Sequence, residues 1–201
     1  MWYNENMKTT IIATTFYMQK YGQRFIDTLH DTNKGMSVTM VDQSKERYKS
    51  KSAALNYGAS LIPNTEAAIL IFCDDDILWK REIVAHNAAL FGPSLLGNQH
   101  ITYSYKGEDT ILNTGCGFLD GWCIGVRRWL YDMIGGFDEN FINSGMQDAD
   151  FCMAAYKLGI EPVVWGFPGK HLYARTKFLI NPDHLDTRQK NVLYLKKKYN
   201  L

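Results

Sequence analysis

The sequence predicts an α/β fold in which helices flank a mainly parallel sheet. Three runs of residues, 9–16, 36–41 and 68–73, are almost continuously apolar or β-branched, which is typical of strands buried on both faces. Segments with apolar residues at helical spacing lie between these runs, and such an alternation favours a parallel sheet. The 201 residues suit a single domain, residues 1–201, and the 46% of hydrophobic residues can supply its core.

The first half of the chain alternates regularly between strands and helices. The strand at 9–16 carries Thr14 and Phe16 to its carboxyl end, and a helix is expected at 21–31. The strand at 36–41 ends at Asp42 and precedes a helix at 45–62. The third strand, 68–73, is followed by three consecutive aspartates and then by a predicted helix at 80–91.

The second half of the chain is less regular. Short strand-like pieces at 101–105, 117–126 and 162–166 are separated by glycine-rich turns, a pattern that is typical of binding loops. Apolar residues at helical spacing predict one helix at 148–158 and a last helix at 183–199.

Charge and cysteine content restrict the class of protein. The net charge of +1 argues against binding of nucleic acid or anionic lipid by the protein as a whole. The basic residues at 188–198 favour a solvated helix end, with a nucleic-acid or membrane-surface contact as the alternative. Four widely spaced cysteines, without a Cys-x-x-Cys pair, predict buried free thiols in a reducing compartment: Cys73, Cys116, Cys123 and Cys152.

The lengths of the apolar segments indicate where in the cell the protein is expected. The run at 67–73 is far too short to cross a membrane, and the first seven residues do not resemble a secretory signal. We therefore expect a cytoplasmic protein without a transmembrane segment.

Three predicted strands end in side chains that suit a nucleotide diphosphate. In a parallel α/β sheet, ligands bind beyond the carboxyl ends of the strands, where the residues at 14–16, Asp42 and the aspartates at 74–76 should converge. An aromatic ring can stack on a base, and a carboxylate can accept a base N–H. Clustered carboxylates repel one another unless a cation is present, and they are ligands for Mg²⁺ or Mn²⁺.

Several motifs in the same order resemble glycosyltransferase family 2, whose members are inverting enzymes with the GT-A fold. Residues 72–76, Phe-Cys-Asp-Asp-Asp, are similar to the family's DXD motif at the end of a core strand. Residues 51–58 resemble its Ala-rich helix that ends in Asn-x-Gly. Residues 135–141, Gly-Gly-Phe-Asp-Glu-Asn-Phe, are close to its Gly-Gly-Phe-Asp-Glu segment. The resemblance spans residues 9 to about 176.

This resemblance implies roles for individual residues. It places Thr14, Phe16 and Asp42 at the uracil base, Lys51 near the diphosphate or the base, and Asp74 at the ribose. It places Asp76 at the metal, with Asp75 as a substitute for either neighbour and His171 as a further metal ligand. The alternatives are that Asp42 begins a turn and that His171 is held by backbone groups.

The acceptor side of the predicted site lies in the second half of the chain. Where the family has a Glu-Asp pair, this sequence has Gln147 and Asp148, which changes any role of the glutamate in holding acceptor hydroxyls. Sugar transfer needs a base for the attacking hydroxyl, and Asp148 is the candidate because it begins a helix. Trp122 lies at the expected acceptor loop. Helix capping for Asp148 and Asp150, and a core position for Trp122, are the alternatives.

The sequence therefore predicts a metal-dependent inverting glycosyltransferase that uses a UDP-sugar and Mn²⁺ or Mg²⁺. Residues 9–95 would bind the nucleotide-sugar, residues 96–182 would bind the acceptor and catalyse transfer, and 183–201 would form the C-terminal helix. The acceptor could be a glycan, a lipid-linked sugar, a protein or a modified nucleobase. The alternatives are a nucleotidyltransferase-like Mg²⁺ enzyme and a non-catalytic module that binds a nucleotide-sugar.

Overall fold

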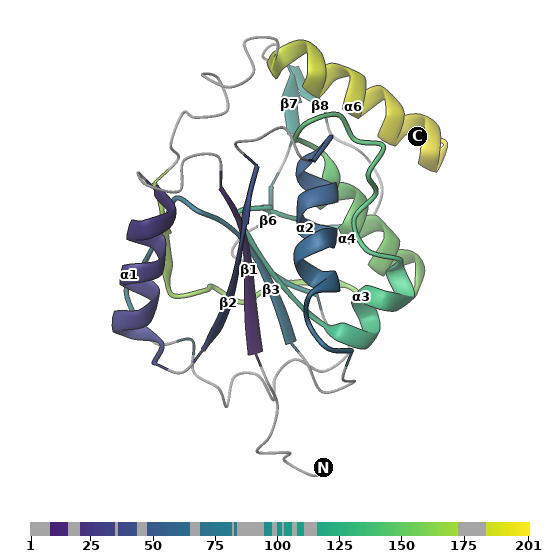
Figure 1. The fold of residues 1–201 in the computed structure, drawn as a ribbon. Helices are drawn as coiled ribbons and strands as arrows, with labels where there is room; N and C mark the ends of the chain where they lie inside the picture. The colour runs from purple at the N-terminus through teal and green to yellow at the C-terminus, as the bar shows by residue number, and fades with distance from the viewer. Residues whose placement is uncertain are drawn as a thin grey trace.

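The computed structural model places helices around a central sheet (Figure 1). It describes residues 9–15, 21–34, 36–43, 48–64, 69–81, 83, 95–97, 100–101, 103–105, 108–110, 116–172 and 184–201.

The central sheet has six strands in the order β11-β5-β10-β3-β1-β2. β1 runs parallel to β2 and β3, β11 runs parallel to β5, and β10 is antiparallel to both of its neighbours. This arrangement confirms the predicted α/β class with a mainly parallel sheet. The strand bounds are β1 Thr9–Thr15, β2 Ser37–Asp42, β3 Ile69–Asp74, β5 Leu95–Gly97, β10 Cys123–Arg127 and β11 Pro162–Val164.

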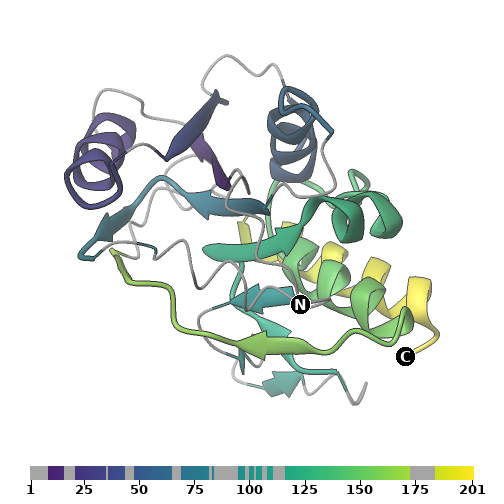
Figure 2. The same ribbon diagram turned by 90° about the horizontal axis from the view of Figure 1, so that it is seen from below.

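The central strands are buried on both faces, as their continuous apolar sequences require. Successive side chains of a strand point to opposite faces, so Ile11 and Ile12 enter two different apolar clusters. On β3, Ile71 and Phe72 divide in the same way. One cluster contains Phe25 of α1, and the other contains residues of α2, α3, α4 and α6. The sheet therefore has helices on both faces, with α1 on one side and the other helices on the opposite side (Figures 1 and 2).

The helices agree in part with the sequence prediction. The predicted helix at 45–62 begins only at residue 51, because the Ser50 hydroxyl accepts the Ala53 N–H and caps the helix there. α3 was not predicted; its last residue is Ile134, and Gly135 caps it in the left-handed region (φ 88°). The bounds are α1 Gln23–Thr32, α2 Lys51–Ser60, α3 Arg128–Ile134, α4 Gln147–Lys157 and α6 His184–Tyr199.

The predicted helix at 80–91 does not begin where the sequence pattern placed it. Instead, β4 (Ile77–Trp79) pairs antiparallel with β12 (Gly169–His171), and Lys80 extends this contact by donating its N–H to Pro168 O. The Ile83 N–H donates to the Asn33 side chain rather than to a helical carbonyl. Residues 82 and 84–91 lie outside the described part of the chain.

Two further strand pairs come from the second half of the chain and are separate from the central sheet. β6 (His100–Ile101) pairs with β9 (Phe118–Leu119), and β7 (Tyr103–Tyr105) pairs with β8 (Glu108–Thr110). Within the described ranges, every helix is too short or too polar to cross a lipid bilayer. The cysteines are free thiols as predicted, although Cys116 is half-buried rather than buried.

Candidate active site

The carboxyl end of β3 and the turn that follows it position two of the three consecutive aspartates. Asp74 ends β3, and its backbone N–H donates to Trp122 O at 2.9 Å. Asp76 is 7% exposed and precedes β4, and its carbonyl accepts the Leu172 N–H at 2.9 Å. Because β4 pairs with β12, this turn lies beside His171, which is opposite Ile77 in the register.

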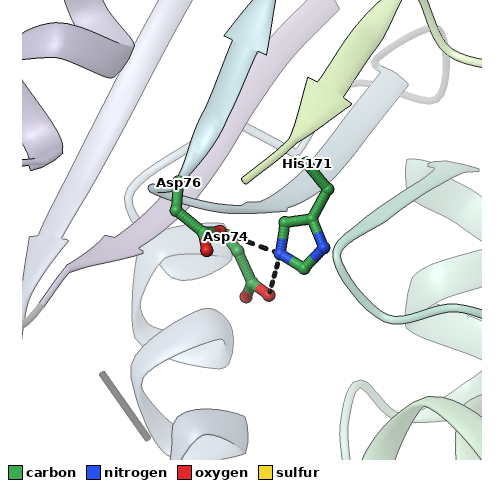
Figure 3. A group of neighbouring side chains, drawn as sticks. All are labelled: Asp74, Asp76 and His171. Atoms are coloured by element: carbon green, nitrogen blue, oxygen red, sulfur yellow. Dashed lines mark ion pairs between the residues drawn. The ribbon is translucent and has the colours of Figure 1, made fainter. Parts of the chain in front are cut away.

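Asp74, Asp76 and His171 form a compact group of potential metal ligands (Figure 3). His171 Nε2 lies 2.9 Å from Asp76 Oδ1 and 3.7 Å from Asp74 Oδ2. One ligand atom from each residue lies within 4.8 Å of the others. Two carboxylates and an imidazole are a donor set that suits Mn²⁺, and carboxylates also suit Mg²⁺, so the side chains present fit a divalent cation.

Lys51 brings a positive charge to the same group of residues. It is the first residue of α2, and its backbone N–H donates to Asn143 O at 2.7 Å. Its ammonium forms an ion pair with the Asp74 carboxylate. Burial alone would lower the pKa of Lys51, but the nearby carboxylates, chiefly Asp74, raise it above its ordinary value. Lys51 is therefore a fixed cation at this edge of the sheet.

The middle aspartate is held apart from the ligand group. The Thr15 hydroxyl donates to Asp75 Oδ2 at 2.5 Å, which ties Asp75 to the end of β1. Burial raises the pKa of Asp75 to about 6, and the charges of Asp74 and Asp76 act in the same direction. The bond from Thr15 opposes this rise.

Asp148 lies in the first turn of α4, and two backbone N–H groups hold its carboxylate. Its Oδ2 accepts the Gly121 N–H at 3.1 Å, and its Oδ1 accepts the Ala149 N–H at 2.9 Å. A Cβ at position 121 would lie 2.7 Å from Asp148 Oδ2, so glycine is required for this approach. Asp148 lines one pocket together with Lys51, Gly121 and Gln147. This cavity has room for about one water molecule, and its other walls are largely apolar.

Gln147 and Trp122, the two predicted acceptor residues, are both largely buried. Gln147 Oε1 accepts the Gly145 N–H at 2.5 Å, which fixes the chain where it enters α4. The Trp122 ring is 7% exposed and stacks on His171, with ring centroids 5.3 Å apart and an interplanar angle of 5°. Contact of either residue with an acceptor remains a prediction.

The predicted nucleotide-binding residues lie at the ends of neighbouring strands. Thr14 is buried on β1 and is in register with Asp74 on β3. Asp42 is exposed at the end of β2, beside Thr15. Phe16 lies outside the described residues. The strand ends of β1, β2 and β3 are therefore adjacent, as predicted, and the base contacts of these residues remain a prediction.

Two motifs that are far apart in the sequence contact each other behind the site. Asn56 of α2 binds both backbone groups of Phe137: its Oδ1 accepts the N–H at 2.9 Å, and its Nδ2 donates to the carbonyl at 2.8 Å. Its Oδ1 also accepts the Tyr131 hydroxyl at 2.8 Å. The Ala-rich helix thus holds the Gly-Gly-Phe-Asp-Glu segment.

Sequence analysis missed the residue that fixes the segment before α4. Asn191 of α6 is 1% exposed, accepts the Ile142 N–H at 2.9 Å, and donates to Ile142 O and Gly145 O, both at 3.0 Å. The available signal was a polar residue beside Val192 and four positions before Leu195, on the apolar stripe of the last helix.

No protein-family model matches this sequence, and no curated protein sequence matches it. Solved structures do share its fold. A mannosyltransferase from Pyrobaculum calidifontis, in complex with GDP-Man and Mn²⁺, is 14% identical with a TM-score of 0.61, over 93% of this chain and 64% of that chain. Drosophila β1,4-galactosyltransferase 7, crystallised with manganese, UDP-Gal and xylobiose, is 13% identical with a TM-score of 0.52, over 85% and 73%.

Staphylococcus aureus TarS is 18% identical with a TM-score of 0.53, over 81% of this chain and 36% of that chain. At these identities the similarity concerns the fold, which is the GT-A fold of glycosyltransferases.

Proposed function

We propose that this protein is a metal-dependent glycosyltransferase that moves a sugar from a UDP-sugar to an acceptor hydroxyl with inversion of the anomeric centre. One observation carries the proposal: Asp74, Asp76 and His171 meet at the carboxyl end of a core strand in a GT-A fold. This is the edge at which parallel α/β sheets bind their ligands. The neighbouring structures crystallised with Mn²⁺ and a nucleotide-sugar support the same class of reaction.

The proposed donor site uses side chains from the first half of the chain, residues 9–95. Asp74, Asp76 and His171 would hold Mn²⁺ or Mg²⁺, which when bound stabilises the negative charge of a leaving nucleoside diphosphate. Lys51 would add a second, permanently placed positive charge for the same leaving group. Thr14, Phe16 and Asp42 would contact the base. His171 comes from the second half, so both halves contribute to the site.

The proposed acceptor site lies in residues 96–182. Asp148 would accept the proton of the attacking hydroxyl, because its carboxylate is held by the Gly121 N–H and lies near the charge of Lys51. Gln147 and Trp122 would lie behind the acceptor, where only the small exposed part of each residue could contact it. The acceptor class stays open between glycans, lipid-linked sugars, proteins and modified nucleobases.

Asp150 provides a matched control for Asp148. It lies in the same first turn of α4, but its Oδ1 binds Lys198 Nζ at 2.7 Å and accepts the Tyr199 hydroxyl at 3.0 Å, so it faces α6. Asp148→Asn should reduce release of UDP by about 10²–10⁴-fold while nucleotide binding survives, because the proton acceptor is lost. Asp150→Asn should reduce stability far more than turnover.

The experiment begins with a panel of nucleotide-sugars and Mn²⁺, with release of the nucleoside diphosphate as the measurement. Binding of UDP by the wild type should require the metal, and Asp76→Ala should lose the metal-dependent part of that affinity. Equal affinity of the wild type for UDP in EDTA and in Mn²⁺ would contradict the proposal. Metal-dependent binding without any turnover would indicate a binding module instead, and a product with retained configuration would exclude the inverting mechanism.

A further inference from the structure

The short turn at 120–122 contacts both the candidate base and the group of candidate metal ligands. It connects β9 with β10 and contains Gly121 and Trp122. The Gly121 N–H donates to Asp148, the Trp122 carbonyl accepts the Asp74 N–H, and the Trp122 ring stacks on His171. One segment of the chain thus touches the candidate base and two of the three candidate metal ligands.

The stacking geometry restricts how the imidazole can lie. With an interplanar angle of 5° and centroids 5.3 Å apart, the indole packs parallel to His171 with an offset, while Nε2 at the edge of the imidazole is directed at the Asp76 and Asp74 carboxylates. Flat contact between aromatic rings favours one ring orientation over others. An imidazole that is already oriented loses less conformational freedom when it binds a metal.

The burial of Trp122 indicates that its role is directed inward. Its side chain is 7% exposed, which leaves little ring surface for a sugar to cover. Its Nε1 lacks a hydrogen-bond partner among the residues that the structure describes, whereas its ring packs parallel to His171.

We infer that Trp122 is a positioning residue that orients His171 and thereby sets the affinity of the Asp74, Asp76 and His171 group for a divalent cation. This inference rests on the proposed function, because it requires that this group binds the metal. Residues that orient a ligating histidine typically change metal affinity by about 10–100-fold when they are removed.

The test measures Mn²⁺ binding by the full chain, from the loss of the electron paramagnetic resonance signal of free Mn²⁺. Trp122→Leu removes the ring and should weaken Mn²⁺ binding by about 10–100-fold. Trp122→Phe keeps an aromatic face without the N–H and should stay much closer to the wild type. In a His171→Ala background, Trp122→Leu should cause no further loss, because the two residues act through one contact.

Three outcomes would overturn the inference. Mn²⁺ affinity could be unchanged in Trp122→Leu, the losses of Trp122→Leu and His171→Ala could simply add, or Trp122→Phe could lose as much as Trp122→Leu. If Trp122→Leu does not fold, the test compares the nuclear magnetic resonance signals of the His171 ring protons in the wild type and in Trp122→Phe, which both fold. Stacking requires that the ring current of Trp122 shifts them upfield and that the shift decreases with the smaller ring.

The failure of this inference can be told apart from failure of the proposed function. If Asp76→Ala weakens Mn²⁺ binding but Trp122→Leu does not, only the role of Trp122 is wrong. If the wild type and Asp76→Ala bind Mn²⁺ alike, the metal group itself is wrong and the role of Trp122 is rejected with it.

Discussion

Replacing Asn191 by leucine should show how strongly the C-terminal helix supports the site. The side chain of Asn191 makes three hydrogen bonds to the backbone of the segment before α4, at Ile142 and Gly145. This segment also supplies the Asn143 carbonyl that accepts the Lys51 N–H. Leucine has a similar volume but leaves one N–H and two carbonyl groups without these partners.

The magnitude follows from the number of bonds lost. The three hydrogen bonds are part-buried, and each contributes about 0.5–1.5 kcal/mol net, so their loss should cost about 2–4 kcal/mol in total. Since about 1 kcal/mol shifts Tm by about 2–4 °C in a protein of this size, we expect a decrease of about 5–15 °C. Thermal unfolding followed by circular dichroism measures this shift.

A second variant tests the same reasoning through its pH dependence. Asn191→Asp keeps an acceptor for the Ile142 N–H but directs a carboxylate at the carbonyls of Ile142 and Gly145. A buried carboxylate in that position has a raised pKa, so its ionised form destabilises the fold above that pKa. The stability of this variant relative to the wild type should therefore improve as the pH falls.

The control is Lys190→Leu, an exposed position on the same helix, which should change stability by no more than about 0.5 kcal/mol. A change in stability of Asn191→Leu that is as small as that of Lys190→Leu would refute the structural argument. So would an Asn191→Asp variant whose stability relative to the wild type does not depend on pH.

Three more predictions concern charges and close contacts around the site. Burial would raise the pKa of Asp138, but Lys198 and other hydrogen-bond donors lower it below its ordinary value. This carboxylate therefore stabilises the fold at a pH above its unfolded pKa. The contribution is lost as the pH falls through its folded pKa. Lys198→Met should thus lower Tm at pH 7, and melting curves of variant and wild type should converge toward pH 3. Gly121→Ala should displace Asp148 and destabilise the protein by about 1–3 kcal/mol, with a larger effect on turnover than on nucleotide binding in paired assays. Asp42→Asn should weaken UDP binding and relax discrimination among UDP, GDP and CDP, and an unchanged ranking in competition assays would contradict its contact with the base.

The strands were the most predictable part of the fold. Strands buried on both faces of a sheet are rich in apolar and β-branched residues, so the runs that became β1 and β3 were visible without any tertiary information, and the similar run of the edge strand β2 was visible as well. The polar residues that end these strands were equally visible. Their convergence was also predictable, because the carboxyl ends of parallel strands lie at one edge of a sheet. Asp74 and Asp76 could therefore be assigned to this edge before the structure was known, and the family resemblance added Lys51.

The helices were harder to predict because their ends depend on particular side chains. Ser50 starts α2 several residues later than the apolar pattern indicated, through one bond to Ala53. Lys80, where a helix was expected to begin, instead continues the contact between β4 and β12, which involves residues far apart in the sequence. The spacing of apolar residues indicates which residues are buried, but it does not indicate which distant segment packs against them.

The sequence by itself determined the fold class, the strand ends and the kind of chemistry that carboxylates at those ends can support. Only the tertiary structure decided that His171 meets Asp76, that Trp122 stacks beside the imidazole, and that Gly121 rather than another loop residue holds Asp148. Local periodicity fixes which face of a strand or helix is buried, because burial depends on neighbours within a few residues. Contacts between loops depend on strand register and on the path of the chain between strands, which arise only when the whole sheet assembles.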